Sequence, residues 1–296
     1  MSNATPVVIA VLLAELAPAA AFGFAGERVV RAVARWPLAA RIAMPALLVL
    51  PYVVIAATQH MFRWQWCAFY AMVPVAMAWL LARAASADSE QRGNWRDAVI
   101  LIALGLAVDL RWLDSAWPAD LPGLGKLLLV DAGLYGFLAI RRLSGTGFDF
   151  RLRWSEWKAD WKSGLRELVF FAPAVLVLGL ALGFIHPHAN LPPLGKAALA
   201  WAGIFVFVAV PEELFFRAWV QNLLERRVGR RAALVIASVF FGLSHFNKRS
   251  AHFNWRYVLL ATIAGIFYGR AWREDRRVPA STITHTWVDW LWSFWF

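Results

Sequence analysis

Residues 197–220, AALAWAGIFVFVAVPEELFFRAWV, decide the fold class. A membrane-spanning helix needs about 20 mainly apolar residues, and this stretch is long enough to supply them. It nevertheless contains Glu212, Glu213 and Arg217. A charge at the centre of a membrane helix costs about 2.5 to 3.5 kcal/mol on insertion scales, and such residues normally face a protein interior or a wet cavity. The stretch therefore predicts a membrane helix that carries a functional site.

The composition of the whole chain agrees with a membrane protein. Of the 296 residues 60% are hydrophobic, and the mean hydropathy is +0.54. Soluble domains have about 45–50% apolar residues. The net charge of +11 would suggest nucleic acid as a partner of a soluble protein, but here the basic residues lie in short loops between apolar segments. We therefore expect no nucleic-acid partner, and contact of the basic loops with anionic lipid instead.

Ten apolar segments predict an all-α fold, a polytopic transmembrane helical bundle of about 8–10 membrane helices. The segments are residues 6–25, 38–58, 66–82, 97–113, 124–140, 168–185, 197–224, 232–246, 255–270 and 279–296. In or beside the odd-numbered connections lie 22 of the 30 Lys and Arg residues, whereas the even-numbered connections hold 7. By the positive-inside rule the odd connections are cytoplasmic and both termini lie outside. We expect a multi-pass protein of a bacterial cytoplasmic (inner) membrane.

Residues 151–167 differ from the other connections because they are amphipathic. Trp154, Trp157, Trp161 and Leu165 recur at helical spacing on one face, with basic residues towards the flanks and back. This pattern predicts an interfacial amphipathic helix on the cytoplasmic leaflet, with an ordinary soluble linker helix as the alternative. The organisation changes near residue 195. We divide the chain into N-terminal membrane helices at 1–195 and a membrane core at 196–296, which contains Glu212, Glu213 and Arg217.

Helical geometry sorts the charges of the opening stretch. Glu213 and Arg217 are four residues apart with the glutamate first, which favours an ion pair on one face of the helix. Glu212 lies about 100° away around the helix and has no partner within it. Pro211 removes a backbone hydrogen bond and tends to kink a helix, which would open space beside the carboxylates. A buried ion pair that fastens helices together is the structural alternative for Glu213 and Arg217.

The next apolar segments supply two histidines. His245 follows Phe241 by four residues, so both side chains face the same way. His285 and Asp289 have the same spacing, which allows the carboxylate to orient the imidazole in a metal or acid–base site. A single histidine in a membrane helix is more often a hydrogen-bonding bridge between helices. Three such motifs on three late segments together indicate one site.

These three motifs resemble those of the CPBP intramembrane proteases, the family that includes CAAX-processing enzymes. The matching patterns are Glu212-Glu213-x-x-x-Arg217, Phe241-x-x-x-His245 and His285-x-x-x-Asp289. Residues 264–270, AGIFYGR, also resemble the small-residue helix that the family places between the second and third motifs. The resemblance covers residues 196–292 and leaves residues 1–195 unexplained.

The resemblance implies an intramembrane endopeptidase in which Glu212 activates water with help from His245. It implies that His285 and residue 289 stabilise the oxyanion, while Glu213, Arg217 and Phe241 support the site. Many members have Asn at the last position, whereas this chain has Asp289. An ionised Asp cannot donate to an oxyanion, so Asp289 is either protonated or serves only to orient His285.

The sequence leaves open whether the site binds a metal and which class of function it serves. The glutamate mechanism requires no cofactor, but Glu212, His245 and His285 are also the ligand types of a catalytic Zn²⁺ site, although no His-Glu-x-x-His motif is present. A catalytically silent membrane scaffold or immunity protein on the same fold, and a proton-coupled transporter, are the rival functions. The expected substrate is a membrane-associated peptide or protein, for which leader peptides, bacteriocins and membrane-anchor tails are all possible.

Overall fold

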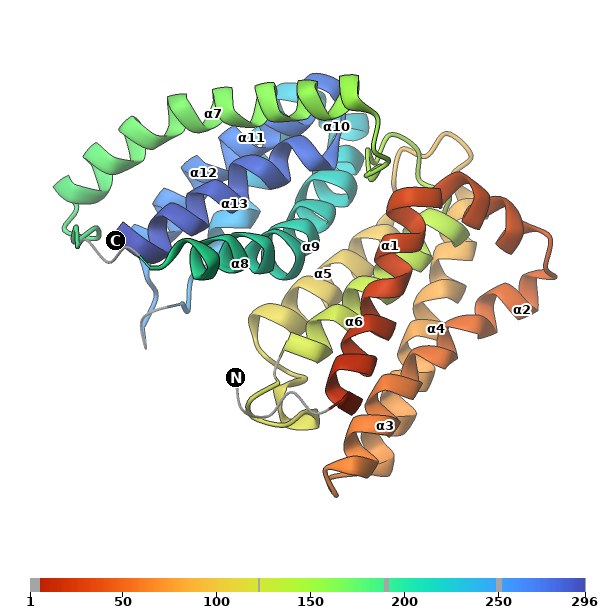
Figure 1. The fold of residues 1–296 in the computed structure, drawn as a ribbon. Coiled ribbons are helices and arrows are strands. Elements are labelled where there is room, and N and C mark those ends of the chain that lie inside the picture. Colours follow the sequence, from red (N-terminus) through yellow and green to blue (C-terminus); the bar gives the residue numbers. More distant parts are fainter. Residues whose placement is uncertain (1–5, 122, 189–191, 249–251, 296) are drawn as a thin grey trace. The chain divides into compact units, whose positions relative to one another are not determined.

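The computed structural model describes residues 6–121, 123–188, 192–248 and 252–295, and every regular element within them is a helix (Figure 1). The chain forms two compact units, Met1–Ser144 and Gly145–Phe296. This division follows packing, whereas the boundary predicted near residue 195 follows the position of the motifs. The predicted boundary stays a prediction, and each unit is described separately below.

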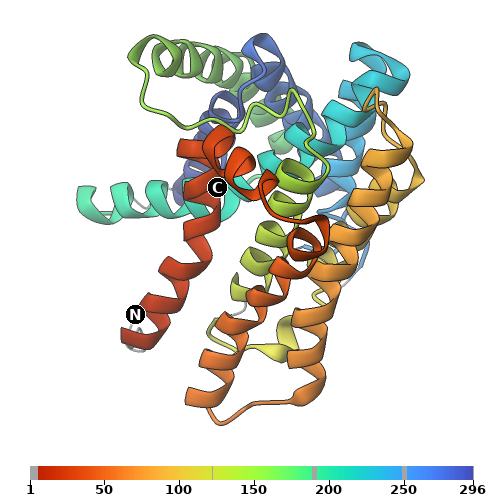
Figure 2. The same cartoon turned by 90° about the vertical axis from the view of Figure 1, so that its right-hand side faces the viewer.

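The N-terminal unit is a bundle in which neighbouring helices are joined by short turns. Figure 2 shows α3 and α4 side by side and joined by a turn, where the hydroxyl of Tyr52 donates to the carbonyl of Arg63 at 3.0 Å and accepts from its N–H at 2.9 Å. The elements are α1 (Pro6–Ala34), α2 (Leu38–Ala43), η1 (Met44–Leu48), α3 (Val49–Thr58), α4 (Trp64–Ala87), α5 (Trp95–Asp109), η2 (Asp114–Ala116), α6 (Gly123–Leu134) and η3 (Tyr135–Ile140).

The C-terminal unit contains every residue of the three motifs. Its helix α7 packs against α12 and α13, and α11 packs against α12. The elements are α7 (Trp154–Ala181), α8 (Leu194–Ile204), η4 (Phe205–Ala209), α9 (Val210–Glu213), η5 (Leu214–Gln221), α10 (Asn222–Val228), α11 (Arg230–Leu243), α12 (Trp255–Asp275) and α13 (Val278–Trp295).

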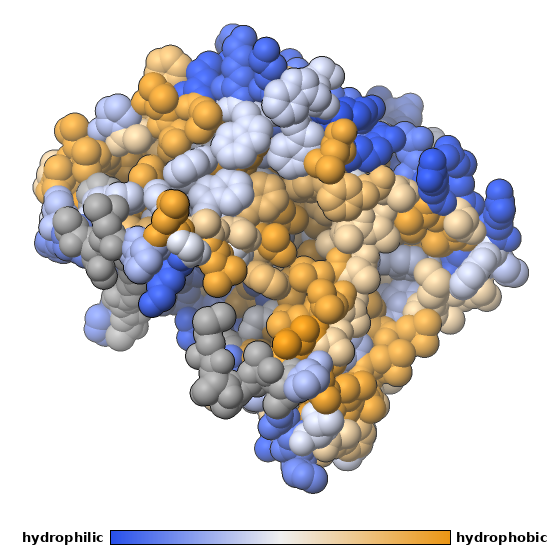
Figure 3. All heavy atoms as spheres, viewed as in Figure 1, coloured by the Kyte–Doolittle hydropathy of each residue, from blue (hydrophilic) through white to orange (hydrophobic). Residues whose placement is uncertain are grey.

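The all-helical polytopic fold is confirmed, and the protein is an integral membrane protein. Each of the ten apolar segments coincides with a helix. Within the described residues six helical stretches are long and apolar enough to cross a membrane: Pro6–Ala34, Leu38–Thr58, Trp64–Ala87, Gly123–Ile140, Trp154–Ala181 and Leu194–Val228. In the N-terminal unit, apolar side chains cover the flank between polar groups at its two ends (Figure 3).

The remaining four segments fall short of the spanning criteria for identifiable reasons. Helices α5 and α11 have only 15 and 14 residues. Helices α12 and α13 are less apolar, since α13 carries His285 and Asp289 among its Ser and Thr residues. The helix of the second motif is therefore too short, and the helix of the third motif is too polar, to meet these criteria.

The amphipathic segment at 151–167 does not form a separate interfacial helix, and in this respect the prediction was wrong. It joins the sixth apolar segment in the single 28-residue helix α7. The buried face of its first half is polar, with Asp160 and Glu167 fully buried, whereas Trp154 is 84% exposed. Of the predicted face, Trp154 and Leu165 are exposed, whereas Trp157 and Trp161 are half-buried, and Trp161 stacks on Trp201 with ring centroids 6.0 Å apart. The acidic residues on the other face are buried because arginines from the end of α12 and the α12–α13 junction meet them.

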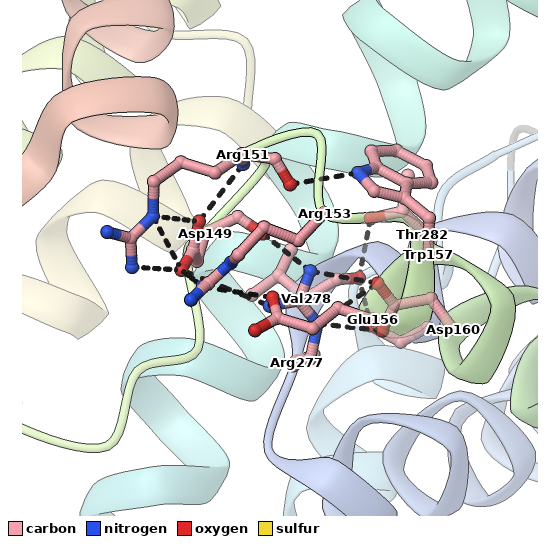
Figure 4. A network of polar contacts seen from close by, with 10 residues as sticks. Asp149, Arg151, Arg153, Glu156, Trp157, Asp160, Arg277, Val278 and Thr282 are labelled. Carbon is pink, nitrogen blue, oxygen red and sulfur yellow. Dashed lines mark hydrogen bonds and ion pairs between the residues drawn. The ribbon is translucent and has the colours of Figure 1, made fainter.

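Arg277 is the centre of this polar contact (Figure 4). Its guanidinium donates to both carboxylate oxygens of Asp160 at 2.9 and 3.0 Å, to Glu156 at 2.6 Å and to the carbonyl of Asp149 at 3.1 Å. Next to it, the N–H of Val278 donates to the carbonyl of Gly147 at 2.9 Å. Arg277 thus ties the loop before α7, the first turns of α7 and the start of α13 together.

Asp149 connects this network to solvent, outside the membrane helices. Burial raises the pKa of its carboxyl, but hydrogen bonds from Arg151 and the charges of Arg151 and Arg153 lower the pKa more, and the net shift is downward. A carboxyl with a lowered pKa in the folded protein stabilises it above the unfolded pKa of about 3.9. That contribution is lost only as the pH falls through the still lower folded value, so this part of the network should be intact at neutral pH.

We expect Arg277→Gln to destabilise the C-terminal unit, because it leaves the buried carboxylate of Asp160 without its cation. Breaking a buried ion pair from one side typically costs about 3–5 kcal/mol. The midpoint of thermal unfolding in detergent should fall by several degrees. Arg231→Gln is the matched control, because Arg231 is exposed on α11. Equal melting of the two variants would contradict the role given to Arg277.

Candidate active site

The long helical stretch Leu194–Val228 departs from α-helical geometry around the first motif. The segments η4 and η5 are π-helical, and between them lies the single α-helical turn α9, which contains Pro211, Glu212 and Glu213. We expected a kink at Pro211, and the backbone accommodates this proline between two π-helical segments. Such segments occur frequently at functional sites because they turn side chains away from the regular helical positions.

Glu213 lies between a cation and a histidine. Its Oε2 accepts from Nε of Arg217 at 2.9 Å, and its Oε1 lies 2.8 Å from Nδ1 of His285. Glu213 and Arg217 are 0% exposed, and His285 is 2% exposed. The structure therefore contains the predicted ion pair and adds a second partner for Glu213 on α13.

The other nitrogen of His285 faces two more carboxylates. Nε2 lies 3.4 Å from Oδ2 of Asp289 and 3.9 Å from Oε2 of Glu212. The side chains of Glu212 and Asp289 are 15% and 38% exposed, whereas the Glu213 side is closed. The two adjacent glutamates thus approach the same imidazole from its two nitrogens, although they point in different directions on their own helix.

Hydrogen-bond donors and acceptors determine what this ring can do. A carboxylate accepts hydrogen bonds and does not donate them, so His285 interacts with Glu213 and Asp289 best with a proton on each nitrogen. An imidazole in that form donates and carries positive charge. Such a group can stabilise negative charge that develops on a neighbouring oxygen.

His245 has the opposite arrangement. Its Nδ1 lies 2.8 Å from the carbonyl of Phe241 and 3.2 Å from the hydroxyl of Ser244, which itself donates to the same carbonyl at 2.8 Å. Because a carbonyl only accepts, Nδ1 carries the proton and Nε2 retains its lone pair. Glu212 and His285 both lie within electrostatic range of this ring. His245 is thus equipped to accept a proton or a hydrogen bond, whereas His285 is equipped to donate.

Aromatic rings hold the two histidines apart and in place. The ring of Phe241 lies 4.9 Å from that of His245 and 5.7 Å from that of His285, the second pair at 89°. On its other side His285 stacks on Tyr268, with centroids 4.6 Å apart and planes at 16°. Arg217 lies over the rings of Phe241 and Tyr268, at 5.4 and 6.0 Å from their centroids. Phe241 therefore connects all three motifs.

Tyr268 is the site residue that the motif analysis did not single out. It lies in the AGIFYGR segment and is 1% exposed. The small residues of the same segment gave the available signal. A Cβ on Gly265 would lie 3.0 Å from the backbone of Ser238, so the glycine allows α12 to approach α11 closely. That approach brings Tyr268 against His285 and Phe241.

Comparison with known proteins gives one result for this part of the chain. Residues 194–291 match the family described as Rce1-like, type II CAAX prenyl endopeptidase. Over this region the chain is therefore similar to the CPBP, or CAAX protease, family. The match supports protease activity of the CAAX intramembrane endopeptidase type, with a membrane-associated protein as substrate. No curated protein and no solved structure was found to match the chain.

The metal question concerns the same side chains. Within the described residues, no three His, Cys, Asp and Glu side chains are grouped as a metal site would group them. The alternative with Zn²⁺ on Glu212, His245 and His285 stays a prediction. Glu213 behind His285 is compatible with it, since carboxylates in this position also orient metal-bound histidines.

We expect Arg217→Met to lower thermal stability strongly, since it roughly preserves volume but leaves the fully buried Glu213 with His285 as its remaining cationic partner. The penalty for such a half-broken pair is about 3–5 kcal/mol. In Glu213→Gln/Arg217→Met both charges are absent, so this double variant should melt higher than Arg217→Met alone. Thermal melting of the purified variants checks both statements, and wild-type melting of Arg217→Met would contradict the structural role.

Proposed function

We propose that residues 194–296 form the catalytic core of an intramembrane endopeptidase in which Glu212 is the base that activates water. The observation that carries this proposal is the position of Glu212 beside Nε2 of His285, on the partly exposed side of an otherwise buried site. A base must be accessible to water, and Glu213 is not, because it is fully buried between Arg217 and His285. The two neighbouring glutamates therefore have different tasks.

In the proposed mechanism Glu212 takes a proton from the attacking water, and His245 assists through Nε2. General-base catalysis requires an acceptor that can be reached by the water, and the tautomer of His245 fixed by the Phe241 carbonyl provides a second acceptor. The proton removed from water is then available to the leaving amine. Peptide cleavage at neutral pH needs this proton, because an amide anion is a poor leaving group.

The oxyanion of the tetrahedral intermediate is assigned to the Nε2–H of His285, because the Nδ1–H is engaged by Glu213. Its cationic form, held by Glu213 from behind, suits the stabilisation of a developing negative charge. Asp289 keeps the ring in place from the Nε2 side at 3.4 Å. Since an ionised Asp289 cannot donate to the oxyanion, we assign it the orienting role rather than direct stabilisation.

The proposed substrate is a membrane-associated peptide or protein cut near the membrane. The matched family is described by its action on CAAX prenyl proteins. For this chain the apolar side chains exposed beside the site helices, such as Val235 and Val239 on α11, favour a substrate that arrives from the membrane. Leader peptides, bacteriocins and membrane-anchor tails all fit that requirement.

The first test is Glu212→Gln, which removes the base and keeps the shape of the side chain. We expect cleavage of a membrane-anchored reporter peptide to fall by at least about 100-fold, the lower end of what a positioned base contributes. Thermal melting should stay close to that of the wild type, because Glu212 is at the partly exposed edge of the site. Reporter cleavage in proteoliposomes and melting in detergent measure the two quantities.

Glu90→Gln is the matched control, because Glu90 pairs with Arg92 at an exposed position in the N-terminal unit. Wild-type cleavage by Glu212→Gln would overturn the base assignment. If neither the wild type nor any variant cleaves the reporters, while the wild type moves protons across the proteoliposome membrane, the transporter reading would replace the protease.

The second test concerns the cofactor. We propose that cleavage needs no metal, so activity should persist in a strong chelator and the purified protein should lack stoichiometric Zn²⁺. Elemental analysis measures the Zn²⁺ content, and the cleavage assay with chelator is run on the same purified sample. One Zn²⁺ per chain, together with loss of cleavage in chelator and recovery on adding Zn²⁺, would replace the glutamate mechanism by the metal-dependent one.

A further inference from the structure

A basic pocket lies in the N-terminal unit, where three connections between helices meet. Its volume is about 340 Å³, and its lining includes Arg41, Arg141, Arg142 and Asp88. Arg41 is near the start of α2, Asp88 follows α4, and Arg141 follows η3. All three points are helix ends, so the pocket lies where the membrane helices of this unit leave their apolar segments.

The acidic residue of the pocket is already engaged. Asp88 accepts from the N–H groups of Arg92 and Gly93 at 3.0 and 2.8 Å and from Arg141 at 2.5 Å. Burial raises the pKa of Asp88, but these hydrogen bonds lower it more, and the pKa lies below the usual range. Arg141 also pairs with the buried Asp97 at 3.0 Å. Arg141 thus lines the pocket with its charge neutralised by Asp88 and Asp97.

Arg41 and Arg142 supply the remaining positive charge. The Nε of Arg41 is buried and has no hydrogen-bond partner among the described residues. Its own carbonyl accepts from the hydroxyl of Tyr135 at 2.7 Å, so the backbone that carries this guanidinium is held in place. Arg142 is exposed on the rim. A buried donor without a partner is costly. Arg41 as a whole is only half-buried and lines the pocket, so a turn of its side chain would let the guanidinium donate to an anion there.

The size and the surroundings of the pocket select among anions. A volume of about 340 Å³ lies at the lower end of small-molecule sites, which is more room than a bare phosphate ion needs. Leu38, which also lines it, is 51% exposed, and Leu47 and Leu50, further along the same helical stretch on η1 and α3, are exposed as well. A ligand with an anionic head and acyl chains matches this combination.

We propose that this pocket binds the phosphodiester headgroup of an anionic phospholipid, with Arg41 and Arg142 as its charged contacts and the exposed Leu38 at its edge against the acyl chains. Arginine forks bind phosphate oxygens in pairs, and basic pockets between membrane helices are a known type of headgroup site. The connections that form the pocket are among those that the distribution of Lys and Arg places in the cytoplasm. The proposal is independent of the protease mechanism.

The test measures how phosphatidylglycerol affects thermal melting of the full chain in detergent, with phosphatidylcholine and inorganic phosphate as comparison ligands. For the wild type we expect phosphatidylglycerol to raise the melting midpoint and the other two to have little effect. For Arg41→Gln/Arg142→Gln the half-saturating concentration of phosphatidylglycerol should rise about tenfold or more, the effect of losing hydrogen bonds to a charged group.

The matched control is Arg35→Gln/Arg83→Gln, which removes the same charge from exposed positions of two of the same connections without touching the pocket lining. It should keep the response of the wild type. An equal loss in both double variants would overturn the proposal in favour of diffuse attraction, and an equal response to inorganic phosphate would overturn the lipid assignment. Because Arg142 is exposed, Arg142→Gln alone should fold, and its weakened response keeps the test valid if the double variant unfolds.

Discussion

The position of His285 between acidic side chains is the constraint on which the site depends. Glu213 holds Nδ1 at 2.8 Å, and Asp289 and Glu212 lie beside Nε2. Three carboxylates around one ring would repel each other in an apolar interior, so a compensating positive charge is required. Arg217 provides part of it at Glu213, and a doubly protonated His285 provides the rest. The first and third motifs are therefore one electrostatic unit, although they lie about seventy residues apart.

The two histidines differ because their neighbours differ. A carbonyl behind His245 leaves it with a lone pair, whereas carboxylates on both sides of His285 favour a ring that donates from both nitrogens. Enzymes commonly obtain an acid and a base from identical residues by giving them unlike surroundings. Phe241 contributes to both, because its carbonyl fixes one ring and its side chain packs against the other. This explains the value of an aromatic residue one helical turn before His245.

Patterns that act within one helix were predictable from sequence, and contacts between helices were less so. All six helical stretches that are long and apolar enough to span a membrane contain a predicted apolar segment, and the four-residue spacing predicted the Glu213–Arg217 pair. The stacking of Tyr268 on His285 depends on how closely α11 and α12 approach, which only the fold determines. The π-helical segments beside Glu212 change the direction of side chains from that of an ideal helix. The continuity of α7 was missed because its buried acidic face resembles a solvated one until Arg277 is placed opposite.

The role of α7 also shows why the family match and the structural unit have different limits. The match begins at residue 194, whereas the compact unit begins at Gly145. Helix α7 contributes the fully buried Asp160 to Arg277 and the fully buried Glu167 to Arg270, at 2.9 Å in both cases. Thr284, next to His285, donates to the carbonyl of Gly164 on α7 at 2.9 Å. The helix that carries His285 is thus anchored to a segment outside the matched region, and the geometry of the third motif depends on contacts that the motifs themselves do not encode.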